Sequence, residues 1–471
     1  MHTEVSPFPE VGVVGAGPAG RRLVDLLAAS GRRVVVLGRG FTARDVARCG
    51  LVIAAVPGAA EQSVLDELDR LCCETTVLAT TAVPAGVSPP RPDRFLAVQF
   101  CGPAARTTVL EINTPAGAPP ALTAVADAFA ADLSRTGPRV RSGTRCAEAA
   151  NAVVLAMLRD AAGMVAEGYV TAEDLDAAMR AGAGMAVGPM GLASEWGLPP
   201  VAAADVVPRA SGTPRTVRKI AVAGTGTMAQ GIARVFASAG FDTLVVGRSA
   251  DRLAGDGFAV STDYAALADR DLVVEAVAED LAVKREVMAL IDLECRPGAV
   301  LATTTSSLPV VEIALATSRP HDVVGLHFFN PAPVMELVEV VRTGHTGADV
   351  LATALRVCAD LGKLPVVCGD RAGFVVNRLL FPCLNATLAS LDGLDPGALD
   401  AAVRAALGLP LGPLRLLDVV GTDIALEIQR SLWRATRGSA PASVLERLVA
   451  DGVLGSKNGR TVRKALTGAR A

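Results

Sequence analysis

Two glycine-rich segments are the first residues of this sequence whose types and spacing can do chemistry. An apolar run at 219–223 leads into Gly-Thr-Gly-Thr-Met-Ala at 224–229, and another at 11–14 leads into Gly-Ala-Gly-Pro-Ala-Gly at 15–20. Glycines at this spacing between a strand and a helix allow a tight turn and close approach of the backbone to a pyrophosphate. We therefore predict that Gly224, Gly226, Thr227 and Met228 bind a dinucleotide at the helix N-terminus. A tight turn without a ligand is the alternative, and it has more weight for the N-terminal segment.

The end of the next strand indicates which dinucleotide fits. NAD-binding sheets usually carry Asp or Glu there, to hydrogen-bond the ribose hydroxyls. This sequence has Gly247 followed by Arg248, and the N-terminal segment has Gly38 followed by Arg39. The missing acid removes repulsion from a 2′-phosphate, and arginine offers a planar cation to it. We expect NADP, with NAD as the alternative if Arg248 is simply solvated.

The stretch Gly325-Leu-His-Phe-Phe-Asn-Pro-Ala-Pro-Val-Met-Glu-Leu-Val-Glu339 carries a family resemblance. With it, the chain resembles the L-3-hydroxyacyl-CoA dehydrogenase family. The other supporting motifs are Gly224-x-Gly-x-Met228, Val274-Glu-Ala-Val-x-Glu279 with Lys284, Ser306-Ser-Leu308 and Asp370-x-x-Gly-Phe-Val-Val-Asn-Arg378. The resemblance covers about 217–435 closely. It extends into the tail at Leu454-Gly-Ser-Lys-Asn-Gly459, where Thr461 and Val462 replace the aromatic residues usual in the family.

The resemblance implies a site that oxidises an alcohol. Such oxidation needs a base for the hydroxyl proton while hydride leaves carbon, and the reverse reduction needs an acid. Histidine suits both because its unperturbed pKa of ~6.5 lies near working pH, and a carboxylate can orient the ring and stabilise imidazolium. The family assigns these roles to His327 and Glu339. Ser306 and Asn377 would then hydrogen-bond the reacting oxygen and the junction of cofactor and substrate.

The resemblance also implies the surroundings of the nicotinamide. Asn330 and Glu279, together with Ser306, are expected to line it, and Lys284 is expected near the cofactor or the phosphates of the substrate. One position departs from the family, because Thr304 stands where Asn is usual. Threonine keeps a hydroxyl but lacks an amide, so we expect an altered local network without loss of chemistry.

The N-terminal segment repeats this plan without its reactive side chains. The matched positions are Gln99 for His327, Val83 for Ser306, Gly58 for Glu279, Ser63 for Lys284, Glu111 for Glu339 and Asn151 for Asn377. Glutamine cannot act as a base at neutral pH, and valine cannot hydrogen-bond. We therefore expect a catalytically inactive copy, which supplies within one chain the contact that family members make by pairing through their helical domains.

These repeated features predict a tandem duplication. In each copy strands alternate with helices and then give way to helices alone, which is typical of a Rossmann-type doubly wound parallel α/β sheet followed by an α-helical domain. The predicted divisions are a degenerate Rossmann-like domain at 10–142, a short helical domain at 143–207, a polar linker at 208–216, an NAD(P)-binding Rossmann domain at 217–369 and a helical C-terminal domain at 370–471.

Composition excludes several classes of protein. With 471 residues, 51% hydrophobic and 20% charged, the chain is neither disordered nor a small disulfide scaffold. A net charge of −3 argues against nucleic-acid binding, and apolar runs short of ~20 residues argue against a membrane span. The nine cysteines and four histidines show no metal-site spacing, so no metal is expected. Scattered cysteines, without a secretory signal in the first nine residues, favour a cytoplasmic protein.

The functional expectation is an oxidoreductase that interconverts (S)-3-hydroxyacyl and 3-oxoacyl thioesters of CoA or acyl carrier protein, in fatty acid metabolism or a biosynthetic pathway. A dehydrogenase of a non-thioester hydroxy acid or polyol is the second enzyme hypothesis. A non-catalytic dinucleotide-binding scaffold is the contrasting one. The expected assembly is a pseudo-dimer within the chain, with a homodimer as the alternative.

Overall fold

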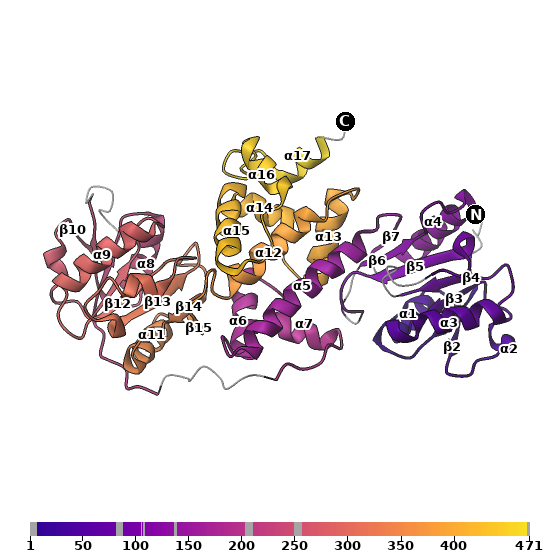
Figure 1. Cartoon of the computed structure of the whole chain (residues 1–471), viewed down its shortest axis with the longest axis horizontal. Coiled ribbons are helices and arrows are strands. Elements are labelled where there is room, and N and C mark those ends of the chain that lie inside the picture. Colours follow the sequence, from indigo (N-terminus) through magenta and orange to yellow (C-terminus); the bar gives the residue numbers. More distant parts are fainter. Residues whose placement is uncertain are drawn as a thin grey trace.

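The computed structural model describes residues 7–81, 88–104, 106, 109–135, 139–202, 211–248 and 257–468. Two α/β sheets lie at opposite ends of the molecule, and a group of helices fills the space between them (Figure 1). The indigo sheet comes from the N-terminal half of the chain, and the salmon sheet comes from the C-terminal half. The expected fold class, Rossmann-type sheets combined with helical domains, is confirmed.

The first sheet has seven strands in the order β2-β1-β3-β4-β5-β6-β7. Its strands are β1 (Glu10–Val14), β2 (Arg33–Leu37), β3 (Leu51–Ala54), β4 (Val77–Thr80), β5 (Phe95–Phe100), β6 (Val109–Asn113) and β7 (Arg139–Ser142). The helices of this part are α1 (Pro18–Ala29), α2 (Ala43–Val46), α3 (Gly58–Leu71) and α4 (Pro120–Ser134).

The second sheet has eight strands in the order β10-β9-β8-β11-β12-β13-β14-β15. Its strands are β8 (Lys219–Ala223), β9 (Asp242–Val246), β10 (Ala259–Ser261), β11 (Leu272–Glu275), β12 (Val300–Thr303), β13 (Val323–Phe328), β14 (Leu337–Arg342) and β15 (Leu364–Gly369). The helices of this part are α8 (Thr227–Ser238), α9 (Leu281–Glu294), α10 (Val310–Ala314) and α11 (Ala348–Asp360).

Each sheet contains one antiparallel pair, which differs from the expectation of an all-parallel sheet. These pairs are β5 with β6 and β13 with β14, while the other pairs in both sheets are parallel. The connection from β13 to β14 is too short for a crossover helix, so the chain must return beside the strand it has just left. The antiparallel register places Glu339 opposite His327, and Glu111 opposite Gln99.

The central helices come from both halves of the chain. They are α5 (Cys146–Ala166), α6 (Ala172–Ala183), α7 (Pro189–Glu195), α12 (Val376–Ala389), α13 (Pro396–Leu407), α14 (Pro413–Val420), α15 (Thr422–Thr436), α16 (Ser443–Ala450) and α17 (Val462–Gly468). Apolar side chains of α5 such as Val154 and Leu158 share one buried cluster with Leu399 and Val403 of α13. The helices of the two halves therefore form a single hydrophobic core.

Helix α5 is longer and more apolar than the sequence analysis expected. Its 21 residues and hydropathy of 1.4 would suffice, by length and composition, to cross a membrane. Its buried side chains pack against α12 and α13, as those of a core helix do. The apolar run is therefore explained by the shared helical core.

Each half also contacts the sheet of the other. In α6, a Cβ on Gly182 would lie 2.8 Å from Leu337 and Val376 of the C-terminal half. In return α13 lies against the N-terminal sheet, where a Cβ on Gly102 would lie 2.7 Å from the Cα of Ala406. Glycine is needed at 102 for this close approach, and because its φ of 99° disfavours other residues.

The described part of the expected linker is anchored to the second sheet domain. Arg215 donates its backbone N–H to Thr353 at 2.8 Å and its guanidinium to Asp349 and Asp322, at 2.8 and 2.7 Å. Residues 211–216 therefore lie along α11, although their polar sequence shows no regular pattern. The remainder of the expected linker, 208–210, lies outside the described residues.

Candidate active site

The candidate residues gather where neighbouring strands of the second sheet end. Gly224 follows β8, Glu279 lies beyond the end of β11, and Ser306 follows β12. His327 is the penultimate residue of β13. Because β8 lies between β9 and β11, the chain changes direction across the sheet here, and ligands of doubly wound sheets bind at such a point.

The glycine turn after β8 leaves the helix N-terminus open. Gly224 has φ 142°, and a Cβ there would lie 2.3 Å from the carbonyl oxygen of Ala276, so no larger residue fits. A Cβ on Gly226 would meet nothing within 4 Å. Gly226 is the N-cap of α8 and brings no side-chain cap, so the first N–H groups of this helix are free for a pyrophosphate. The turn therefore fits a dinucleotide.

His327 and Glu339 form a buried pair across β13 and β14. Nδ1 of His327 lies 2.7 Å from Oε2 of Glu339. The residues are 6% and 0% exposed, so the contact is shielded from water. The His327 ring is also held by Phe329 and Phe374, whose ring centroids lie 4.6 and 5.5 Å away. The pair can therefore hold and move a proton with the ring in a fixed orientation.

The buried carboxylate of Glu339 is stabilised by the start of α12. Its Oε1 accepts the backbone N–H groups of Val375 and Val376 at 3.1 and 2.9 Å. These groups point at the carboxylate because Gly373 and Phe374 adopt left-handed conformations, with φ of 74° and 47°. Two backbone donors at the positive end of a helix offset the cost of burying an anion.

Glu279 organises the turn that carries Ser306. Its Oε1 accepts hydrogen bonds from the Thr305 hydroxyl at 2.7 Å, and from the Ser306 N–H and hydroxyl at 2.8 and 3.0 Å. Burial opposes ionisation of Glu279, but the charge of Lys284 and these hydrogen bonds together lower the pKa of the carboxyl below its usual range. The turn is thus tied to an ionised side chain.

Lys284 lies in a buried network of ion pairs near the start of α9. Its ammonium is 1% exposed and lies 3.0 Å from Glu275 and 3.5 Å from Glu279. Glu275 is itself fully buried and accepts the Thr303 hydroxyl at 2.6 Å. The ion pair with Glu279 positions the carboxylate that holds Ser306, and the expected contact of Lys284 with the cofactor or the phosphates of the substrate stays a prediction.

The remaining candidates lie at or just beyond the ends of other strands and helices. Asn377, 9% exposed, follows the two residues that hold Glu339. Asn330 is exposed just beyond β13, and Arg248 is exposed just beyond β9. Thr304, the position that departs from the family, accepts the Phe328 N–H in a long contact of 3.5 Å.

Family models cover both the sheet and the helices. The NAD-binding domain model of 3-hydroxyacyl-CoA dehydrogenase matches residues 254–371. The model of the C-terminal domain of 3-hydroxyacyl-CoA dehydrogenase matches two stretches, 149–242 and 373–465.

Solved structures are also similar to this chain over about half of its length. FadB2 of Mycobacterium tuberculosis is 38% identical, over 53% of this chain and 99% of FadB2, with a TM-score of 0.50. The chain belongs to the 3-hydroxyacyl-CoA dehydrogenase family. (S)-3-Hydroxybutyryl-CoA dehydrogenase PaaH1 from Ralstonia eutropha is 31% identical, over 52% of this chain and 98% of its own, with a TM-score of 0.51. The chain described here is therefore an NAD-binding oxidoreductase.

The N-terminal half of the chain has an antiparallel strand pair of the same kind, with different side chains on it. Gln99 faces Glu111 in the register that His327 and Glu339 share. Glu111 accepts the Ala147 N–H at 2.8 Å and is also bonded to the Thr144 hydroxyl. Asn151 bonds the backbone of Phe100 and Gly102, at 2.9 and 2.8 Å. Of the other positions matched to the site, Gly58 and Ser63 lie in α3, and Val83 lies outside the described residues.

Sequence reasoning missed several residues that hold the site together. Glu275 accepts hydrogen bonds from both Lys284 and Thr303. Thr305 donates its hydroxyl to the carboxylate of Glu279. The left-handed conformation of Phe374 directs the backbone N–H groups that Glu339 accepts. Glu275 stands nine residues before Lys284, on a different element, so no regular spacing within one strand or helix signals their contact. Nothing in the sequence pattern signals a left-handed conformation at Phe374.

Proposed function

We propose that the C-terminal half interconverts (S)-3-hydroxyacyl and 3-oxoacyl thioesters with NAD(P), using His327 as acid and base. The observation that carries this proposal is the buried contact of 2.7 Å between His327 and Glu339. It stands at the strand ends that also hold the open glycine turn. A purely structural protein has no need of this pair with Ser306 and Asn377 beside it.

The direction of the hydrogen bond sets the proton chemistry. An ionised carboxylate only accepts, so Nδ1 of His327 carries its proton toward Glu339 and Nε2 keeps its lone pair. Nε2 takes the hydroxyl proton of the substrate during oxidation and returns it during reduction. Glu339 stabilises the imidazolium that forms. When bound, the nicotinamide would supply the hydride chemistry, accepting hydride from the carbon that carries this hydroxyl or returning it to that carbon.

Polar side chains around His327 orient the reacting groups. Ser306 and Asn377 hydrogen-bond the substrate oxygen as charge develops on it. Glu279 fixes Ser306 through the bonds to its N–H and hydroxyl, and Asn330 lines the nicotinamide side. Thr304 replaces the usual amide with a hydroxyl and leaves these contacts in place.

The proposed cofactor is NADP, supported by the end of β9. Arg248 is exposed there, directly after the strand end at which the ribose of a dinucleotide is expected. A Cβ on Gly247 would lie 2.4 Å from the Thr225 side chain, so an acid that prefers NAD would be crowded. We expect Arg248→Ala to raise the KM for NADPH about tenfold and the KM for NADH less than threefold, as loss of one Arg–phosphate contact requires. Equal changes for both cofactors would refute the preference.

The N-terminal half is proposed to be a duplicated, inactive partner, and the chain a pseudo-dimer. The seven strands of the first sheet follow the same order as β9 to β15 of the second, which has β10 in addition at its edge. The pairs Gln99–Glu111 and His327–Glu339 share a register, and each half packs a helix on the other's sheet. Pro18 stands after Gly17, where Thr227 follows Gly226, so its helix start has one N–H fewer for a pyrophosphate. A homodimer is the alternative assembly.

The test is oxidation of NADPH and NADH by the purified protein with acetoacetyl-CoA, followed at the nicotinamide absorbance. We expect turnover that His327→Ala abolishes, with cofactor binding retained. Binding of cofactor without turnover of any acyl thioester would instead support a scaffold. Turnover of hydroxy acids or polyols alone would support a dehydrogenase of those substrates.

The thioester carrier and the compartment are further parts of the proposal. Both CoA and acyl carrier protein present phosphopantetheine, so rates with matched acetoacetyl substrates of each would identify the carrier. We propose a cytoplasmic location on the ground that none of the nine cysteines is in a disulfide.

A further inference from the structure

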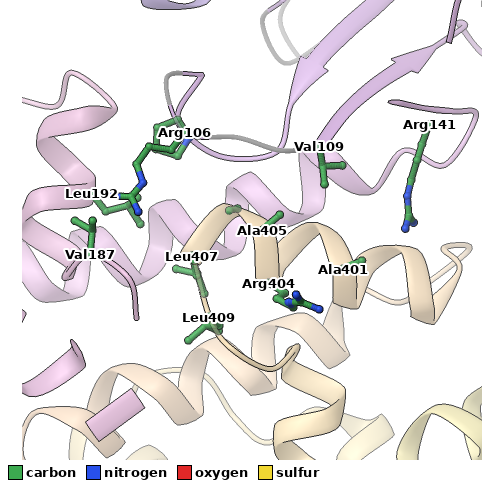
Figure 2. Close-up of a pocket in the computed structure, with 13 residues that line it drawn as sticks. Arg106, Val109, Arg141, Val187, Leu192, Ala401, Arg404, Ala405, Leu407 and Leu409 are labelled. Atoms are coloured by element: carbon green, nitrogen blue, oxygen red, sulfur yellow. The ribbon is translucent and has the colours of Figure 1, made fainter. Parts of the chain in front are cut away.

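A cavity of about 490 Å³ lies between the N-terminal sheet and helix α13 (Figure 2). One wall is formed by the loop after β5 and the edge of β6 and β7, and the opposite wall by α13 and the turn after it. Val187 and Leu192 complete one side. The volume is that of a small-molecule site, and the cavity exists only because the two halves of the chain pack together.

Three arginines and no carboxylate line this cavity. They are Arg106 from the loop after β5, Arg141 from β7 and Arg404 from α13. Arg106 pairs with Glu195 at 3.1 Å, but among the described residues neither Arg141 nor Arg404 has a carboxylate within 4.0 Å. In Figure 2 both side chains extend into the space between β7 and α13. Cations gathered in a cleft repel one another, and a bound anion removes that repulsion.

The rest of the lining is apolar. It consists of Pro103, Val109, Val187, Leu192, Ala401, Ala405, Ala406, Leu407 and Leu409, with Gly408. A cavity with cations and apolar walls suits a ligand that carries both a strong anion and a less polar body. A bare inorganic ion would leave that apolar surface uncovered.

The cations of the sheet wall belong to the N-terminal half alone. Arg141 is paired with Glu111 in the first sheet. The position that corresponds to it in the second sheet, paired with Glu339, is occupied by Val366. Arg106 lies seven residues after Gln99, and the residue seven after His327 is Val334. The half that lacks the histidine thus has basic residues where the other half has valines.

We propose that this cavity binds a small organic phosphate. A phosphate ester carries about two negative charges and three acceptor oxygens, which match several guanidinium groups better than one carboxylate does. The apolar wall contacts the organic part of the ligand. The N-terminal half is then a ligand-binding unit, whichever reaction the C-terminal half performs.

The test is calorimetric titration of the full chain with coenzyme A and with inorganic pyrophosphate. Ala401 lines the cavity from α13, so Ala401→Glu places a carboxylate in it, and Ala401→Gln is the control of equal size. We expect coenzyme A to bind wild type and Ala401→Gln within threefold of each other. Ala401→Glu and the double variant Arg141→Gln/Arg404→Gln should weaken this binding at least tenfold. Binding of coenzyme A that remains in these variants takes place at the catalytic cleft of the C-terminal half. The proposed dehydrogenase activity is assayed separately, so its failure is distinguished from loss of binding in this cavity.

Three results would overturn the proposal. The first is equal affinity of Ala401→Glu and Ala401→Gln for coenzyme A. The second is no binding of coenzyme A to wild type at about 1 mM, a concentration that already corresponds to weak binding. The third is pyrophosphate binding as tightly as coenzyme A, since the apolar wall would then contribute nothing. Thermal melting identifies any variant that does not fold, and binding to wild type that weakens with added salt is the expected sign of the arginines.

Discussion

Replacing Glu339 by glutamine gives the sharpest measure of the catalytic pair. Glu339 accepts three hydrogen bonds, from Nδ1 of His327 at 2.7 Å and from the N–H groups of Val375 and Val376 at 3.1 and 2.9 Å. Glutamine has one oxygen and one NH₂ group. If its oxygen keeps the two backbone donors, its NH₂ faces Nδ1 and forces the ring proton onto Nε2, the atom that must take the proton of the substrate.

The magnitude follows from this change of tautomer. Loss of the base is expected to lower kcat about 10³-fold, or ~4 kcal/mol, within the range of general acid–base catalysis. The opposite orientation of the amide leaves buried backbone donors unpaired and costs about 1–3 kcal/mol of stability for each. Either orientation therefore removes the active arrangement, and the second also lowers the melting temperature.

The assay compares turnover of a 3-oxoacyl thioester in Glu339→Gln with that in Glu111→Gln. Glu111 occupies the same register opposite Gln99 and also accepts a backbone N–H, from Ala147. We expect Glu111→Gln to lose some stability and to keep its rate. A Glu339→Gln rate within threefold of wild type, with normal cofactor binding, would refute the acid–base assignment.

Three further predictions concern single contacts. Glu279→Gln should lower kcat by loosening the turn at Ser306. The pKa of Glu279 in the folded protein is below its usual value, so its ionised form stabilises the fold. Wild type should therefore melt at a higher temperature than this variant at pH 7, and the difference should vanish as the pH falls below ~4. Cys73, exposed and with a pKa lowered to about 7 by hydrogen bonds from neighbouring threonines, should be the first cysteine alkylated by iodoacetamide at neutral pH, as peptide mapping would show. Gly188→Ala should lower the melting temperature, since its Cβ would lie 2.4 Å from the Cα of Asp176.

Much of the fold could be predicted from local patterns. Apolar runs of strand length that end in glycine turns predicted β1 and β8, and Gly224 requires a conformation that few other residues adopt. The family could be recognised because its motifs lie in short continuous stretches. The antiparallel pairs were not predicted, since the apolar pattern of their strands does not differ from that of the parallel strands.

The environment of Lys284 shows why part of the site could not be predicted. The family resemblance predicts that Lys284 lies near the cofactor, and only the structure shows that it is buried between Glu275 and Glu279. Whether a lysine faces a ligand or a carboxylate depends on the packing of α9 against β11, and no local pattern encodes that. The apolar character of the 21-residue helix α5 was likewise explained only by the helices around it.

The sequence by itself determined the residues that can do chemistry: a glycine turn for a dinucleotide, one histidine with a carboxylate twelve residues later, and a second segment that lacks the histidine. Tertiary structure alone decided that His327 and Glu339 face each other with α12 capping the carboxylate, that Lys284 serves Glu279, and that three arginines meet in a cavity between the halves. The physical reason is that conformational preferences act between neighbours in the chain, whereas ion pairs and cavities arise between residues that only packing brings together.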